Sequence, residues 1–213
     1  MSFPIVSKFG VLVPKSYTIT YSSIENFSYK KQLLVLYKRF YKLRLYQADS
    51  HSKMNYVKYL KRKIKYEDFN LRRRIFLEQN CVEDLSPTDI VRRMVNTLAF
   101  VQNASVFNRT YENEARLNGN KNSSKETSGL YAGTIESQIL ATILHMEYSM
   151  PTSVKVDHKF SWVDKLNMVV SQIETPLKFE KSSLKMESTL VLMGYIDYQE
   201  NLMSLNESYR ICL

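Results

Sequence analysis

One stretch of basic and apolar sequence decides the fold class: residues 28–46, which read SYKKQLLVLYKRFYKLRLY. Its larger apolar residues recur at spacings of three and four, as they do along one face of an α-helix. Lys38, Arg39 and Lys42 fall outside this apolar row, so we expect a helix whose basic side chains meet solvent or a partner. The row itself consists of Leu33, Leu36, Tyr37, Phe40 and Leu43 or Arg44.

A second helix is predicted from Asn55 to about Phe76, beyond a polar break at residues 49–52. Its apolar face is interrupted by Asp68 and consists of Val57, Leu60, Ile64, Leu71 and Ile75. Its other face is basic and consists of Lys58, Lys61, Arg62, Lys65, Arg72 and Arg73. The sequence therefore predicts a helical pair with a strongly basic outer surface.

A third helix has the clearest start signal in the chain. Ser86 stands at an N-cap position, Pro87 at the first helical position and Asp89 where a capping box places its acid. Helical spacing of apolar residues continues to about Gln102. Residues 103–130 are rich in Asn and lack this spacing, so we predict a flexible polar linker there.

Three further helices are predicted beyond the linker: from Thr134 to just before Pro151, over residues 162–173 and over residues 190–213. The predicted fold class is therefore all-α, with a basic N-terminal three-helix unit joined by a polar linker to a C-terminal helical half. The predicted parts are a lead-in over 1–27, the three-helix unit over 28–102, the linker over 103–130 and the C-terminal helical region over 131–213.

Composition excludes several classes of function. The chain has 213 residues, of which 44% are hydrophobic, and only five Gly, which argues against glycine-rich phosphate loops and Rossmann turns. Its two Cys and three His lack metal-ligand spacing, and no nucleophile–base, zinc-protease, P-loop or kinase motif is found. The sequence therefore predicts a non-enzymatic protein with no cofactor, and its apolar runs are too short for a transmembrane helix.

The basic charge is concentrated in one third of the chain. Residues 28–75 hold 15 Lys and Arg against three acids, whereas the remaining residues hold 15 against 18. This asymmetry predicts an acidic partner, namely nucleic acid, an acidic protein or an anionic membrane surface; the alternative is a solvated helix face. The candidate partner-binding residues are Lys38, Arg39, Lys42, Lys58, Lys61, Arg62 and Lys65.

Two mechanisms remain open for this basic face. It could dock an acidic protein, as an adaptor does. It could instead contact the phosphates of nucleic acid, with nearby tyrosines available to stack on bases. Those tyrosines are Tyr37, Tyr41, Tyr46, Tyr56 and Tyr59; aromatic residues at helical spacing more often belong to the core.

The N-terminal segment resembles a mitochondrial presequence in part. Residues 1–24 contain no acid and several Ser and Thr, as such presequences do, but they contain no Arg and two prolines. The segment predicts residence in the mitochondrial matrix. The alternative is an unstructured or loosely β-like lead-in.

The tripeptide Leu36-Tyr37-Lys38 in the first helix resembles the Leu-Tyr-Arg motif of the small mitochondrial LYR proteins. Those proteins are three-helix adaptors that bind the mitochondrial acyl carrier protein, so the resemblance implies that protein as the acidic partner. Lys38 replaces the Arg of the motif and lacks the two-pronged guanidinium that Arg offers to carboxylate or phosphate.

A broader resemblance covers several segments of the chain. The runs at residues 35–43, Tyr56-Val57-Lys58-Tyr59 and residues 69–73, with Leu205-Asn206-Glu207 near the end, resemble the fungal increased recombination centers protein nineteen family. That family is also called required for respiratory growth protein four. The resemblance implies a role in mitochondrial DNA maintenance, respiratory growth, sporulation and genome integrity, and it implies no catalytic residue.

Overall fold

The computed structural model of the chain describes residues 5–7, 10–12, 19–47, 50–77, 83–117, 135–173 and 183–213. Within them, the α-helices are α1 Tyr29–Leu43, α2 Ser50–Lys65, α3 Phe69–Phe76, α4 Pro87–Leu117, α5 Ile135–Ser149, α6 Thr152–Val156, α7 Ser161–Ile173 and α8 Ser183–Tyr209. Short 3-10 turns cover η2 Tyr21–Ser23 and η3 Arg44–Tyr46, and strands β1 Ile5–Ser7 and β2 Gly10–Leu12 pair antiparallel. The predicted all-α class is confirmed for the described residues, apart from this three-residue pair of strands.

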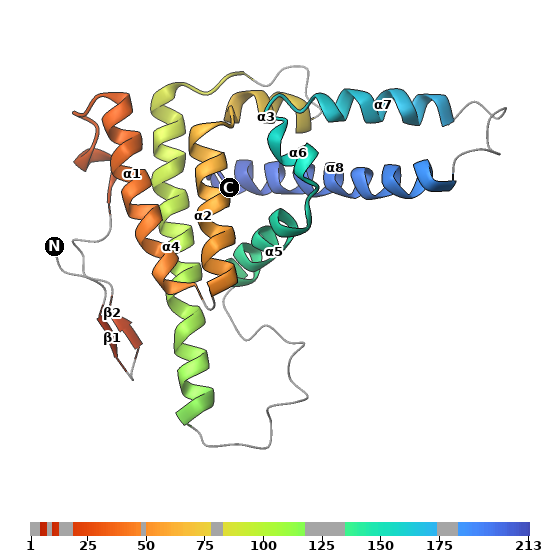
Figure 1. The fold of residues 1–213 in the computed structure, drawn as a ribbon. Helices are drawn as coiled ribbons and strands as arrows, with labels where there is room; N and C mark the ends of the chain where they lie inside the picture. Colours follow the sequence, from red (N-terminus) through yellow and green to blue (C-terminus); the bar gives the residue numbers. More distant parts are fainter. Residues whose placement is uncertain are drawn as a thin grey trace. The chain divides into compact units, whose positions relative to one another are not determined.

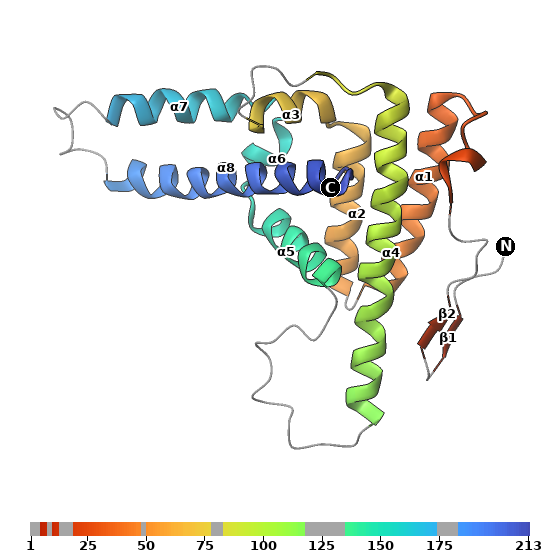
Figure 2. The same cartoon turned by 180° about the vertical axis from the view of Figure 1, so that it is seen from behind.

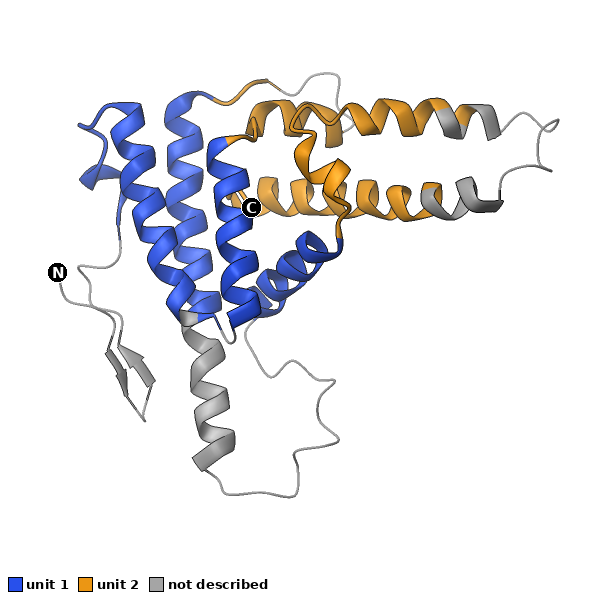
Figure 3. Ribbon diagram, in the orientation of Figure 1, with its two compact units in different colours: residues 1–65, 86–149 blue, residues 66–85, 150–213 orange. Residues whose placement is uncertain are grey.

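Two compact units make up the fold, and neither is continuous in sequence (Figure 3). Unit 1 comprises residues 1–65 and 86–149, and unit 2 comprises residues 66–85 and 150–213. The sequence-based division placed all of 28–102 together and separated it from 131–213. The observed division differs because α3 belongs with the C-terminal helices and α5 belongs with the N-terminal ones.

Among its described residues, unit 1 contains four α-helices, α1, α2, α4 and α5. α4 packs against α1 and α5, and α2 packs against the same two helices, so the four close a ring around one core. Figures 1 and 2 show α1 and α4 side by side from opposite directions. The most deeply buried apolar side chains here belong to Leu36, Leu43, Val91, Leu98 and Ile143.

The start of α4 confirms the predicted capping box. The backbone N–H of Asp89 donates to Ser86 Oγ at 3.1 Å, and the Ser86 hydroxyl donates to Asp89 Oδ2 at 2.7 Å. The predicted end was wrong: α4 continues past Gln102 to Leu117. The linker predicted over 103–130 therefore does not begin at residue 103, and its remainder from residue 118 lies outside the described residues.

The second predicted helix is broken in the structure at Asp68. α2 ends at Lys65, and the Asp68 carboxylate accepts hydrogen bonds from the backbone N–H groups of Asn70 and Leu71 at 3.0 and 3.2 Å. This is the N-cap geometry that satisfies the first donors of a new helix, α3. The single helix expected to about Phe76 is thus two helices that belong to different units.

Unit 2 encloses an arginine that the sequence analysis placed on a solvent-facing surface. Arg72 is 1% exposed, and its guanidinium donates to Gln199 Oε1 on α8 at 2.6 and 2.9 Å. It also donates to the main-chain oxygen of Leu213 at 2.6 Å and pairs with Glu67 at 3.1 Å. A buried guanidinium is stable only when its donors are satisfied, and these contacts fasten α3 to α8.

Arg73 is buried beside it and was also misplaced by the sequence analysis. Its Nε donates to Glu207 Oε1 on α8 at 2.8 Å, and its Nη1 donates to the carbonyl oxygen of Glu83 at the same distance. Arg72 and Arg73 therefore hold α3 against α8 in unit 2. Neither of them contributes to an exposed basic surface.

The last residues of the chain fold back onto unit 2. Arg210 adopts a left-handed conformation with φ 50°, and the Ile211 N–H donates to the Asn206 carbonyl oxygen at 2.9 Å. This arrangement ends α8 in a Schellman motif. The fully buried Asn206 side chain then donates to the main-chain oxygen of Leu213 at 3.0 Å and accepts from its N–H at 2.8 Å.

Replacing Asn206 with Ala should lower the free energy of unfolding by about 2–4 kcal/mol, because two buried main-chain groups of Leu213 lose a partner. Asn201→Ala is the matched control in the same helix, since Asn201 is exposed; it should change stability by no more than about 0.5 kcal/mol. Urea unfolding of both variants measures the difference. Equal effects would contradict the assigned role of Asn206.

Asp157 caps the start of α7. Its carboxylate accepts a hydrogen bond from the Ser161 hydroxyl at 2.6 Å and from two backbone N–H groups, those of Lys159 and Trp162, at 3.2 and 3.1 Å. Slight burial disfavours the charged carboxylate, but the hydrogen bonds outweigh burial. The pKa of Asp157 is therefore lowered from its ordinary value of 3.8.

A lowered pKa in the folded state means that ionised Asp157 stabilises the fold above its unfolded pKa. This stabilisation disappears as the pH falls through the folded pKa. Asp157→Asn should therefore be less stable than the wild type at pH 7, and the gap should close as the pH falls below 3.8. Urea unfolding as a function of pH measures this gap. A gap of constant size from pH 7 to pH 2.5 would disprove the assignment.

Candidate functional site

The two helices α1 and α2 have an excess of positive charge that their own sequence does not neutralise. Residues 29–65 contain twelve Lys and Arg and one acid, Asp49. Such a concentration produces a positive potential that attracts polyanions and is screened by salt. These two helices, both in unit 1, are therefore the candidate functional site, and we call their outward-facing basic side chains the basic face.

The structure places most of the predicted basic residues where a partner could reach them. On α1, Lys38 lies about 200° around the helix axis from Leu36, which is fully buried, and Lys38 is exposed. On α2, Lys58, Lys61 and Lys65 are exposed and share one face at spacings of three and four. Arg39 and Lys42 are half-buried on α1.

Arg62 is the exception among the seven candidates. Its guanidinium forms two hydrogen bonds to the Glu147 carboxylate on α5, at 3.0 and 2.6 Å. The two side chains are only 14% and 8% exposed. Arg62 therefore joins α2 to α5 within unit 1, and the prediction that it lies on the partner-binding face was wrong.

Arg62→Met should destabilise the protein by about 2–3 kcal/mol, because it leaves the Glu147 carboxylate buried without its partner. Lys61→Met, at the residue directly before Arg62, is the matched control and should change the unfolding free energy by about 0.5 kcal/mol or less. The double variant Arg62→Met with Glu147→Met should recover part of the loss. Thermal or urea unfolding measures all three, and equal stabilities of the two single variants would rule out the structural role of Arg62.

The tyrosines proposed to stack on bases are mostly engaged inside unit 1. Tyr56 is buried, and its hydroxyl donates to the Phe40 carbonyl oxygen at 3.0 Å, while Tyr59 is buried beneath the basic side chains of α2. The rings of Tyr37 and Tyr41 stack on each other with centroids 6.0 Å apart. The side chain of Tyr46 lies outside the described residues. Tyr56 and Tyr59 are thus core residues, as helical spacing favoured.

The tripeptide Leu36-Tyr37-Lys38 divides between core and surface. Leu36 belongs to the core of unit 1, Tyr37 is half-buried in the stacked pair and Lys38 is exposed. Leu36 is therefore placed as an ordinary core leucine of an amphipathic helix would be. The geometry gives the tripeptide no feature that distinguishes it from other turns of α1.

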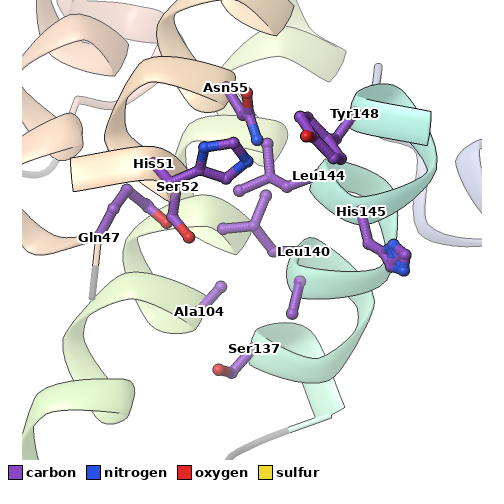
Figure 4. A pocket seen from close by; sticks show the side chains of 11 residues that line it. Gln47, His51, Ser52, Asn55, Ala104, Ser137, Leu140, Leu144, His145 and Tyr148 are labelled. Atoms are coloured by element: carbon purple, nitrogen blue, oxygen red, sulfur yellow. The ribbon is translucent and has the colours of Figure 1, made fainter. Parts of the chain in front are cut away.

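The described residues contain no cluster of His, Cys, Asp or Glu that could hold a metal ion. Among the same residues, no helix combines the length and apolar character needed to cross a bilayer. Unit 1 also contains a cavity near Asn55 that helical periodicity did not indicate (Figure 4). Its lining comes from three helices far apart in sequence, so no local motif could have revealed it.

Comparison with known families identifies the relatives of the chain. The family model of increased recombination centres protein 19 matches residues 7–213. The chain belongs to this family. Family membership confirms the broader of the two resemblances and implies a role in recombination and genome integrity. The resemblance to LYR proteins gains no such support, and neither the curated proteins nor the solved structures contain a match.

Proposed function

We propose that this family member is a non-enzymatic, nucleic-acid-binding factor that maintains mitochondrial DNA and thereby supports respiratory growth and sporulation. Nucleic acid is the acidic partner in this proposal, and the basic face of α1 and α2 is the surface that binds it. The observation that carries the proposal is the ratio of twelve basic residues to one acid over residues 29–65. Family membership supplies the connection to recombination and genome integrity.

The distribution of charge within the helices supports binding to a phosphate backbone. Lys38, Lys58 and Lys61 are exposed lysines, and a lysine ammonium is a mobile donor suited to phosphate contacts without base preference. Neutralising phosphates releases condensed counterions, which favours association and makes it depend strongly on salt. The proposal therefore concerns sequence-independent affinity for DNA or RNA.

The mitochondrial matrix is the proposed compartment. Its support is the acid-free segment 1–24, which is rich in Ser and Thr, together with the respiratory-growth role implied by the family resemblance. A fusion with a fluorescent protein at the C-terminus should co-localise with a matrix marker. A nuclear signal without a mitochondrial fraction would overturn this part of the proposal.

The variant Lys58→Glu with Lys61→Glu tests the basic face. Because both side chains are exposed, the melting temperature should stay within about 2 °C of the wild type. Affinity for a 20-nucleotide DNA should fall at least tenfold, and the slope of log affinity against log salt should shrink by about 0.7–0.9 for each lost phosphate contact. Fluorescence anisotropy at several salt concentrations measures both quantities.

The matched control is Lys159→Glu with Lys165→Glu, which makes the same change of net charge at exposed positions of unit 2. It should bind DNA nearly as the wild type does and support respiratory growth. The Lys58 and Lys61 variant should lose respiratory growth and mitochondrial DNA. If both variants lost DNA binding equally, the change of net charge alone would explain the loss. That result would contradict the proposed surface.

A second candidate function is an adaptor that docks an acidic protein such as the mitochondrial acyl carrier protein. One observation favours it: Leu34 is exposed one turn before the exposed Lys38 on α1, which gives an apolar anchor beside charge. For such a complex, rising salt concentration lowers mainly the association rate, and the complex keeps much of its affinity. The adaptor would be favoured if an acidic protein co-purified with the wild type but not with Leu34→Glu. The protein should then have no affinity for DNA.

A further inference from the structure

The exposed lysines of the basic face form two rows, one on α1 and one on α2. Lys31 and Lys38 are exposed on α1, and Lys58 and Lys65 are exposed on α2. The two members of each pair are seven residues apart in sequence, so they lie on one side of their helix, about 10.5 Å apart along its axis. Lys61 is exposed between the two lysines of the α2 row.

A hydrogen bond between the two helices fixes the register of the rows. α1 and α2 pack against each other, and the Tyr56 hydroxyl donates to the Phe40 carbonyl oxygen at 3.0 Å. The chain reverses between the two helices, so they are antiparallel (Figure 1). Lys38 precedes Phe40 by two residues, and Lys58 follows Tyr56 by the same number. The two lysines therefore lie at the same level, and the outer members of both rows lie two turns further along.

Two rows of cations at matched levels fit two rows of anions. The axes of packed helices are about 8–10 Å apart. Flexible lysine stems project outward from both helices, so their ammonium groups can reach the phosphates on the two sides of a DNA groove, which is about 12 Å wide for the major groove. A single strand has one row of phosphates and can occupy one row of lysines. The arrangement therefore favours a double helix.

The side chains of α1 and α2 that could read base edges are turned inward. Arg, Asn and Gln present the two-pronged groups that pair with those edges. On these two helices they are all buried or half-buried: Gln32, Arg39, Asn55 and Arg62. Gln32, for example, donates to the carbonyl oxygens of Ile24 and Glu25 at 3.0 and 3.2 Å. The fully exposed Lys and Arg side chains of α1 and α2 are all lysines, so the surface suits phosphates of any sequence.

The aromatic rings of these helices are also largely withdrawn from solvent. Of the Phe and Tyr residues on α1 and α2, only Tyr29, in the first turn of α1, is exposed. Tyr37 and Tyr41 are half-buried and stack on each other, and the Arg44 guanidinium lies over the Tyr41 ring, 3.7 Å from its centroid. Proteins that hold single strands stack successive bases on aromatic rings. The basic face offers few ring faces for such stacking.

We infer that the basic face binds duplex DNA in preference to a single strand, with the α1 row on one phosphate strand and the α2 row on the other. Duplex DNA carries one charge per about 1.7 Å of its axis, so a surface of lysines gains more from a duplex than from a strand of lower charge density. DNA is the nucleic acid in this inference because recombination, which the family name specifies, is a reaction of DNA. The inference rests on the proposed function.

Fluorescence anisotropy with a 20-base-pair DNA duplex and with each of its separate strands tests this preference. At one salt concentration, the wild type should bind the duplex at least tenfold more tightly than either strand. The slope of log affinity against log salt should also be steeper for the duplex. Duplexes of unrelated sequence should bind within threefold of one another. A larger spread would overturn the inference, because the surface would then read bases.

Lys31→Gln with Lys38→Gln tests the two-row arrangement. Both positions are exposed, so the melting temperature should stay within about 2 °C of the wild type. Affinity for the duplex should fall at least tenfold, because one phosphate strand loses its lysines. Affinity for the single strand, which can lie along the α2 row, should fall less than threefold. Equal losses for the two probes would overturn the arrangement.

The matched control is Lys159→Gln with Lys165→Gln, which removes the same charge from exposed positions of unit 2. It should keep the wild-type affinity for both probes. If it lowered duplex affinity as much as the α1 variant does, net charge alone would explain the loss and the two rows would have no special role.

The two proposals fail in distinguishable ways. A wild type that binds the duplex and the single strand equally, or that prefers the single strand, would overturn this inference and leave the nucleic-acid-binding function intact. Absence of binding to both probes would overturn both proposals.

Discussion

The Asp68 carboxylate, which accepts hydrogen bonds from the backbone N–H groups of Asn70 and Leu71, is the interaction on which the rest of the structure depends. Asp68 lies three residues after the end of α2 and caps the new helix α3, at the point where the chain passes from unit 1 to unit 2. The break divides one basic run into two roles. The lysines before it stay at the surface of α2, whereas Arg72 and Arg73 after it are buried against α8.

The sequence predicted the local features well, because they depend on neighbouring residues. Apolar spacing located α1 and α7, and the capping box at Ser86 placed the start of α4; the helix predicted from Asn55 to about Phe76 covers only part of α2 and runs on into α3. The burial of Arg72 was not predictable in this way. Its partners Gln199 and Leu213 lie 127 and 141 residues away, and a run of arginines is indistinguishable from a solvated helix face until those partners are placed.

The same limit applies to the candidate site. Helical periodicity identified Lys38, Lys58 and Lys61 as exposed, since these positions lie opposite the core of their own helices. It misplaced Arg62, which is paired with Glu147 on α5, and it did not single out Asn55. Both depend on how α5 packs against α2. Unit 1 thus combines a basic outer surface with a cavity whose described lining contains no charged side chain.

Lysine acetylation with and without bound DNA, read by mass spectrometry at each residue, tests the central claim most directly. The account predicts fast modification of Lys38, Lys58 and Lys61 in the free protein and strong protection of these residues in the complex, while Lys159 and Lys165 react equally in both states. Protection of the unit 2 lysines alone, or no protection at saturating DNA, would contradict a basic face on α1 and α2 that binds nucleic acid.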